Sequence, residues 1–150
     1  MLLSAAEPFH DLSEATLQAA AALAVEERHS AGAFLFQAGD PASDFFVLCQ
    51  GRIRLSISRR GGISYTFNRP GEVLGWSSMA GFESLSASAE CIEPTTVLRI
   101  PAARLIAILE ADPASGLKFY RRLARYIGGR LIESYGATLS MHHEQGPFGG

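Results

Sequence analysis

Hydrophobic and polar positions divide this chain of 150 residues into three parts. From 11 to 28 the apolar spacing predicts a helix that Asp11 or Ser13 can cap. From 33 to 100 short runs of Phe, Val, Ile, Leu and Thr alternate with clusters of Gly, Pro, Asn and Ser, which is typical of many short antiparallel strands. After Pro101 the helical spacing returns. The pattern therefore predicts helices at both ends of the chain and strands between them.

These elements predict one α+β domain over residues 1–150. Many short strands need their edges paired, so we expect an antiparallel β-roll of the jelly-roll kind. The sequence Ser58-Arg-Arg-Gly-Gly62 predicts a hairpin turn within it, because adjacent glycines accept positive φ. The expected parts are an N-terminal helical part over about 8–32, a β-roll over 33–100, C-terminal helices over 103–141 and a flexible tail over 142–150.

The last predicted helix is long and carries two apolar stripes. Asp112-Pro113 provides its N-cap and first turn. Two stripes indicate packing against both the β-roll and something else, although one wide face that covers its own β-roll is the alternative. Gly128-Gly129 either bends the helix or lets another backbone approach closely. The first stripe is Leu117, Tyr120, Ala124, Ile127 and Leu131, and the second is Phe119, Leu123, Tyr126 and Ile132.

Composition describes an ordinary globular protein, with 47% hydrophobic and 19% charged residues and a net charge of −2. That balance argues against a dedicated nucleic-acid binder. No apolar run approaches the length of a membrane span, and the first residues lack the basic region of a signal peptide. Cys49 and Cys91 lie in apolar strand-like runs and are interpreted as buried thiols in a reducing compartment. We therefore expect a cytoplasmic protein.

Catalytic and metal-binding motifs are missing from the sequence. The four histidines lie outside 33–100, which argues against a metal enzyme built on a β-barrel. The adjacent His142 and His143 in the predicted tail have no second ligand cluster. No nucleophile elbow, phosphate-binding loop or dinucleotide loop is present. We expect a protein that is not an enzyme and requires no cofactor.

Two blocks of residues carry a family resemblance. Phe36-Gln-Ala-Gly-Asp40, Phe45-Phe-Val-Leu48 and Gly51-Arg-Ile-Arg54 make the first block, and Pro70-Gly-Glu-Val-Leu-Gly-Trp76 makes the second. Their order and spacing resemble the cyclic-nucleotide-binding domain of regulators of the catabolite activator and Fnr type (Crp/Fnr). The resemblance runs from about Pro8 to Met141. No recognition-helix segment follows the long helix in this sequence, which therefore resembles the sensor half of such a regulator.

This resemblance implies a ligand site for cyclic AMP or cyclic GMP. In the family, the loop opened by the second block holds the ribose and phosphate of the ligand, and Glu72 takes the place of the glutamate that accepts a hydrogen bond from the ribose 2′-hydroxyl. A solvated carboxylate, or one paired with Arg69, is the alternative for Glu72. Trp76 could stack on a base, line an apolar cavity or plug an empty pocket. The site residues that follow are Gly71, Glu72, Val73, Leu74, Trp76, Leu85, Ser86, Ala87 and Arg130.

Leu85 departs from the family pattern. It occupies the position of the phosphate-binding arginine, while Ser86 matches the small hydroxyl residue that follows. Without this cation we expect weak or no binding of cyclic AMP or cyclic GMP. Arg69 or Arg130 could supply the charge, although a solvent-facing helix residue is the favoured interpretation of Arg130. If the loop keeps the family's geometry, Leu85→Arg is expected to strengthen binding about tenfold.

Three functions fit these residues. The first is a cyclic-nucleotide sensor that moves a helix and signals to a protein partner. The second is a degenerate domain that binds another small molecule, such as a different nucleotide, an apolar ligand or a haem-like cofactor. The third is an interaction module with an empty pocket. The resemblance also implies a homodimer through the long helix. Sequence-specific DNA binding and membrane association are not expected.

Overall fold

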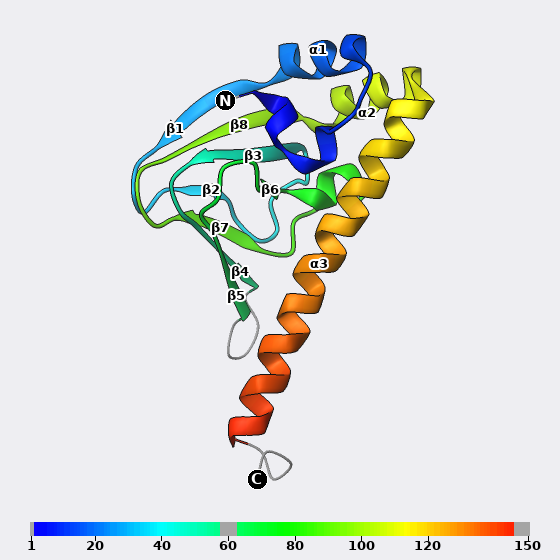
Figure 1. Ribbon diagram of the computed structural model, residues 1–150. Helices are drawn as coiled ribbons and strands as arrows, with labels where there is room; N and C mark the ends of the chain where they lie inside the picture. Colours follow the sequence, from blue (N-terminus) through cyan, green and yellow to red (C-terminus); the bar gives the residue numbers. More distant parts are fainter. Residues whose placement is uncertain (1, 58–62, 146–150) are drawn as a thin grey trace.

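Two antiparallel sheets face each other in the computed structural model, which describes residues 2–57 and 63–145 (Figure 1). Helices gather at one end, and α3 runs along one side. The helical segments are η1 (Leu3–Ala5), η2 (Glu7–Phe9), α1 (Glu14–Leu23), η3 (Trp76–Met79), α2 (Ala102–Ala111) and α3 (Pro113–Gln145). The strands are β1 (Val25–His29), β2 (Phe34–Phe36), β3 (Asp44–Gln50), β4 (Ile53–Ile57), β5 (Ile63–Phe67), β6 (Val73–Leu74), β7 (Ser88–Cys91) and β8 (Thr95–Pro101).

β3 separates two hydrophobic cores. Alternate side chains of a strand point to opposite faces, and both faces of β3 are buried. Phe45 and Val47 face the helices, whereas Phe46 and Leu48 face the second sheet. The first sheet has the order β1-β8-β3-β6 and the second the order β2-β7-β4-β5. The predicted antiparallel β-roll is therefore confirmed.

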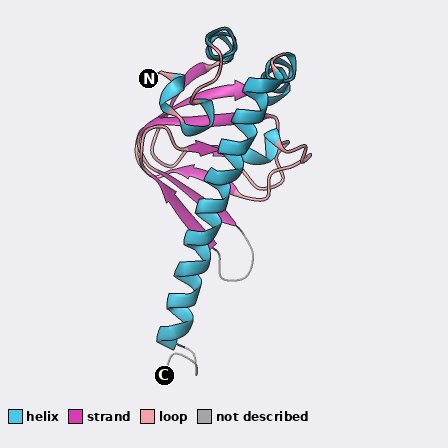
Figure 2. Cartoon of the chain, turned by 45° about the vertical axis from the view of Figure 1, so that its right-hand side comes forward, coloured by secondary structure: helices cyan, strands magenta, loops and turns pink. Residues whose placement is uncertain are grey.

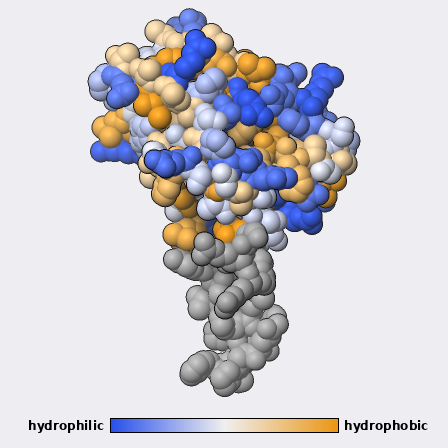
Figure 3. Space-filling model, turned by 180° about the vertical axis from the view of Figure 1, so that it is seen from behind, coloured by the Kyte–Doolittle hydropathy of each residue, from blue (hydrophilic) through white to orange (hydrophobic). Residues whose placement is uncertain are grey.

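β4 and β5 form a hairpin whose pairing runs from Ile53 opposite Phe67 to Ile57 opposite Ile63. Along β4 the buried Ile53 and Leu55 alternate with the exposed Arg54, as the period-two pattern predicts. The predicted turn over 58–62 lies outside the described residues. Figure 3 shows the molecule from behind, with hydrophilic and hydrophobic residues interspersed over the surface of the body.

The N-terminal helix is shorter than predicted. The helix expected over 11–28 begins at Glu14 and ends at Leu23. Ser13 is the cap, because its hydroxyl accepts a hydrogen bond from the Thr16 amide at 3.2 Å. The expected helical part over 8–32 is thus wrong beyond Leu23, because residues 25–29 form strand β1.

Pairing with a distant strand explains β1. It pairs residue by residue with β8, from Val25 opposite Arg99 to His29 opposite Thr95. Arg99 also donates to Glu27 at 2.9 Å. Such tertiary contacts outweigh the local helical preference of a glutamate-rich segment. His29 consequently lies on a strand, although the sequence pattern placed it outside the strand region.

α3 is anchored at its first turns. Hydrogen bonds from the side chains of Ser13 and Thr16 reach the same carboxylate oxygen of Asp112, each at 2.7 Å. Hydrogen bonds from Ser115, Ser13 and Thr16 lower the pKa of Asp112. Phe119 is fully buried, and its ring centroid lies 5.1 Å from that of Phe9. The start of α1 is therefore tied to the start of α3.

The rest of α3 leaves the body of the protein. Figure 2 shows the helix crossing the strands and continuing beyond them. It extends to Gln145, so the expected end at residue 141 and tail over 142–150 are wrong for 142–145, while 146–150 lie outside the described residues. Gly128 and Gly129 do not interrupt it, and an added Cβ at either would meet no atom within 4 Å.

The two apolar stripes of α3 have different surroundings. Phe119 and Leu123 of the second stripe are buried in the helix-side core. Ile132, assigned to the same stripe, is 71% exposed. The first stripe is largely exposed at Leu117, Tyr120, Ala124 and Leu131, while Ile127 packs against the core.

Candidate functional site

The predicted site residues lie around two separate cavities. Gly71, Glu72 and Arg130 line a polar cavity of about 390 Å³ between the N-terminal segment, the β5–β6 loop and α3. Leu74, Trp76, Leu85, Ser86 and Ala87 line an apolar cavity of about 90 Å³ at the second sheet. Val73 lines neither cavity, but its backbone contacts residues of both regions. The structure therefore divides the site that the family resemblance implies.

Glu72 is buried at the base of the polar cavity, with 7% of its surface exposed. One carboxylate oxygen accepts hydrogen bonds from the backbone amides of Asn68 and Arg69, each at 2.9 Å. The other oxygen forms an ion pair with Arg130 of α3. Arg69 itself lies 3.9 Å away and is 77% exposed. Because both oxygens have partners, Glu72 is neither a solvated carboxylate nor mainly paired with Arg69.

Arg130 points inward from α3. Its side chain is 13% exposed, so the interpretation as a solvent-facing residue is wrong. The guanidinium carbon lies 4.6 Å from the ring centroid of Phe67 and 5.5 Å from that of Tyr126, and it is therefore stacked between aromatic and apolar surface. Tyr65 donates a hydrogen bond to the Arg130 carbonyl at 3.3 Å. Burial lowers the pKa of Arg130, which as an arginine keeps its charge.

Tyr126 connects α3 to the strand between the two cavities. Its hydroxyl accepts a hydrogen bond from the Val73 amide at 3.2 Å, and the Val73 carbonyl accepts one from the Trp76 indole at 2.8 Å. The rings of Trp76 and Tyr126 meet edge to face at 6.3 Å. Burial raises the pKa of Tyr126 to about 12, so the hydroxyl stays neutral. The sequence assigned Tyr126 only to an apolar stripe.

Leu85 is buried in the apolar core between the sheets. Both of its backbone polar groups are hydrogen-bonded. Its amide donates to the Asp40 carbonyl at 2.9 Å, and its carbonyl accepts from the Gly39 amide at 2.8 Å. Among the described residues that line the small cavity beside it, none is charged. Ser86 is exposed at the rim. Leu85, at the position where the family has a phosphate-binding arginine, is therefore part of an apolar wall.

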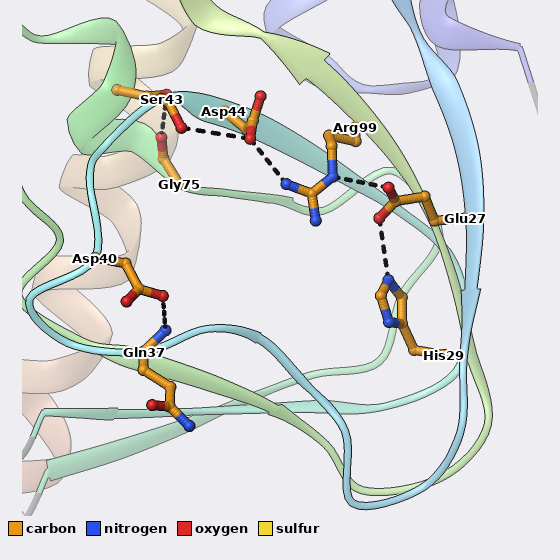
Figure 4. A network of polar contacts seen from close by, with 9 residues as sticks. Glu27, His29, Gln37, Asp40, Ser43, Asp44, Gly75 and Arg99 are labelled. Carbon is orange, nitrogen blue, oxygen red and sulfur yellow. Dashed lines mark hydrogen bonds and ion pairs between the residues drawn. The ribbon is translucent and has the colours of Figure 1, made fainter.

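A third cavity, of about 170 Å³, lies on the other side of this wall. Phe36 and Leu85 line both cavities. Figure 4 shows the polar network near it, in which Arg99 bridges two carboxylates. Its guanidinium donates to Glu27 at 2.9 Å and to Asp44 at 2.8 Å. Both carboxylates therefore share the Arg99 guanidinium as their partner.

Further polar groups on the helices are also paired. Arg122 and Arg125 pair with Asp11 and Glu7 of the N-terminal segment. Together with Arg121 and Lys118 they surround a basic depression. Across residues 2–57 and 63–145, no group of three or more His, Cys, Asp or Glu side chains is arranged to hold a metal ion. No helix in the described part is long and apolar enough to cross a membrane.

Comparison with known proteins shows the family. The family model of the cyclic nucleotide-binding domain matches residues 26–112, which is more than half of the chain. This protein therefore belongs to the cyclic nucleotide-binding domain family, and the resemblance to Crp/Fnr-type regulators is confirmed. The chain is 35% identical over 98 residues to the transcriptional activator protein Anr of Pseudomonas aeruginosa. That match covers 64% of this chain and 40% of Anr, so the chain spans less than half of this relative.

Solved structures share the fold. The catabolite activator protein of Thermus thermophilus aligns with a TM-score of 0.70 at 24% identity, over 93% of this chain and 64% of that chain. The sensor domain of the transcriptional regulator DNR from Pseudomonas aeruginosa aligns with a TM-score of 0.71 at 21% identity, over 88% and 90% of the respective chains. At these identities the likeness concerns the fold.

Proposed function

We propose that this chain is a non-enzymatic regulatory sensor module whose cyclic-nucleotide position is closed. The observation that carries the proposal is the engagement of Glu72 by Arg130, together with the small volume beside Leu85. Pockets for ligands of drug size occupy about 300–1,000 Å³. The polar cavity at Glu72 reaches this range with about 390 Å³, but the cavity beside Leu85, where the phosphate would lie, has only about 90 Å³. A cyclic nucleotide would have to displace Arg130 and bring its phosphate against leucine. This favours the degenerate alternative over a cyclic-nucleotide sensor.

Calorimetry with cyclic AMP and cyclic GMP tests this proposal. The unmodified chain is expected to show no saturable binding with a dissociation constant below about 1 µM. Submicromolar binding of either nucleotide would overturn the proposal.

Leu85→Arg is the second arm of this experiment. The tenfold gain expected above depended on family-like loop geometry, whereas here the new guanidinium would enter the apolar core between the sheets. We therefore expect the variant to gain no affinity and to lose stability, because a buried charge without a partner is costly. A gain of tenfold or more would support the original interpretation.

The module is proposed to signal as a homodimer through α3. The exposed stripe supports this, with Leu117, Tyr120 and Leu131 being 56%, 37% and 49% exposed. A face of this length is typical of a helix that packs against another helix. A protein partner would then detect the position of α3. The free cysteines agree with a reducing cytoplasm, and the net charge of −2 gives no reason to expect sequence-specific DNA binding by these residues.

Leu131→Asp should shift the chain from dimer to monomer in analytical ultracentrifugation, because the substitution places a charge in the apolar stripe. Ile127 is unsuitable for this test, since it packs against its own core. Ile92→Asp is the matched control, because Ile92 is 39% exposed and lies in the turn between β7 and β8. A monomeric unmodified chain at high micromolar concentration would contradict the dimer.

A further inference from the structure

The apolar cavity beside Leu85 has the walls of a small binding site. Side chains of Phe36, Leu55, Leu74 and Trp76 surround it, and Ala87 leaves room within it. The Trp76 indole N–H is already bonded to the Val73 carbonyl, so the ring presents its apolar surface to the cavity. Carbon surface therefore dominates the walls.

These walls define the chemistry of the occupant. With about 90 Å³ available and no charge among the described lining residues, the cavity excludes nucleotides and anions. An enclosed apolar cavity of about 150 Å³ stays dry and takes up benzene or xenon, so walls of this kind bind small apolar molecules. We propose that this cavity binds a small uncharged apolar molecule, of the size of a single hydrocarbon ring or less. The inference rests on the proposed function, because it names the ligand class of the sensor.

The cavity is connected to α3 by a short path. Trp76 forms one wall, and its ring contacts Tyr126 of α3 edge to face. Val73 bonds to both residues, through its amide to Tyr126 and through its carbonyl to Trp76. An occupant that shifts the indole therefore changes a contact with the helix that the module is proposed to use for signalling.

A benzene titration tests the site. The reporter is the indole N–H resonance of Trp76, the single tryptophan of the chain. Benzene is expected to shift this resonance saturably. Benzene should also raise the melting temperature, because a ligand that binds only the folded state stabilises that state. Ala87→Leu fills the cavity and should weaken binding at least tenfold. Ala80→Leu is the matched control, since Ala80 is exposed and does not line the cavity.

A second variant keeps the test decisive if Ala87→Leu does not fold. Leu85→Ala removes part of the wall between the two neighbouring cavities. It should admit naphthalene, which the unmodified chain should exclude. The inference fails if benzene causes no saturable shift up to its solubility limit, or if Ala87→Leu binds as tightly as the unmodified chain. Neither result affects the proposed closure toward cyclic nucleotides, which calorimetry measures separately.

Discussion

Replacing Arg130 by alanine is expected to lower the free energy of unfolding by about 3 kcal/mol, the lower end of the range for breaking a buried ion pair. Glu72 and Arg130 have side chains that are 9% and 13% exposed, so little solvent screens the charge that remains. Two backbone amides would still bond to Glu72, which is why the lower end applies. The substitution also removes the stacking on Phe67 and Tyr126. Urea denaturation followed by circular dichroism measures the loss.

Arg69→Ala is the matched control for this prediction. Arg69 is near the same carboxylate but is 77% exposed, so its removal should cost less than about 0.5 kcal/mol. The double variant Glu72→Gln with Arg130→Met should lose less than the sum of the two single losses, because it leaves no unpaired buried charge. Equal losses for Arg69→Ala and Arg130→Ala would show that the buried ion pair does not hold α3.

Gly75→Ala is expected to destabilise the chain by about 3 kcal/mol and to displace Trp76. Gly75 has φ of 75°, a left-handed conformation that costs other residues about 1–2 kcal/mol. An added Cβ would also lie 2.6 Å from the Asp44 carbonyl oxygen, so the backbone would have to move. Since Trp76 follows directly, its indole environment should change. Thermal melting and tryptophan fluorescence measure the two effects.

Gly81→Ala separates the cost of a positive φ from the cost of the close contact with Asp44. Gly81 has φ of 85°, but an added Cβ there would meet no atom within 4 Å. It should therefore show only the conformational cost, about half of the loss at Gly75. Similar losses at the two positions would mean that the contact with Asp44 relaxes freely.

The β-roll could be predicted from the sequence because the pattern of apolar and polar residues in a strand is a local property. Strand β4 shows the alternation directly in its apolar pattern, whereas β3 is a short continuous apolar run that is buried on both faces. β1 was missed because its conformation depends on β8, about 70 residues away, and not on its own composition. The end of α1 was therefore misplaced.

The candidate site was only partly predictable for the same reason. Glu72 was identified through the family resemblance, whereas its burial became evident only in the structure. The inward direction of Arg130 depends on the rings of Phe67 and Tyr126, which chain folding brings together. Likewise, Tyr126 and Val73 lie 53 residues apart, so no local pattern indicates their hydrogen bond. The separation into two cavities follows from these long-range contacts.

The geometry of α3 makes it a mechanical lever. Phe119, fixed in the core, is a natural fulcrum. At a rise of about 1.5 Å per residue, Arg130 lies about 16 Å along the helix from this fulcrum and Gln145 about 39 Å from it. If the helix stays straight through Gly128 and Gly129, a sideways displacement at Arg130 is therefore more than doubled at Gln145. In the proposed signalling role, a small displacement at the ion pair between Glu72 and Arg130 would therefore become a larger movement of the far end of α3, where a partner could detect it.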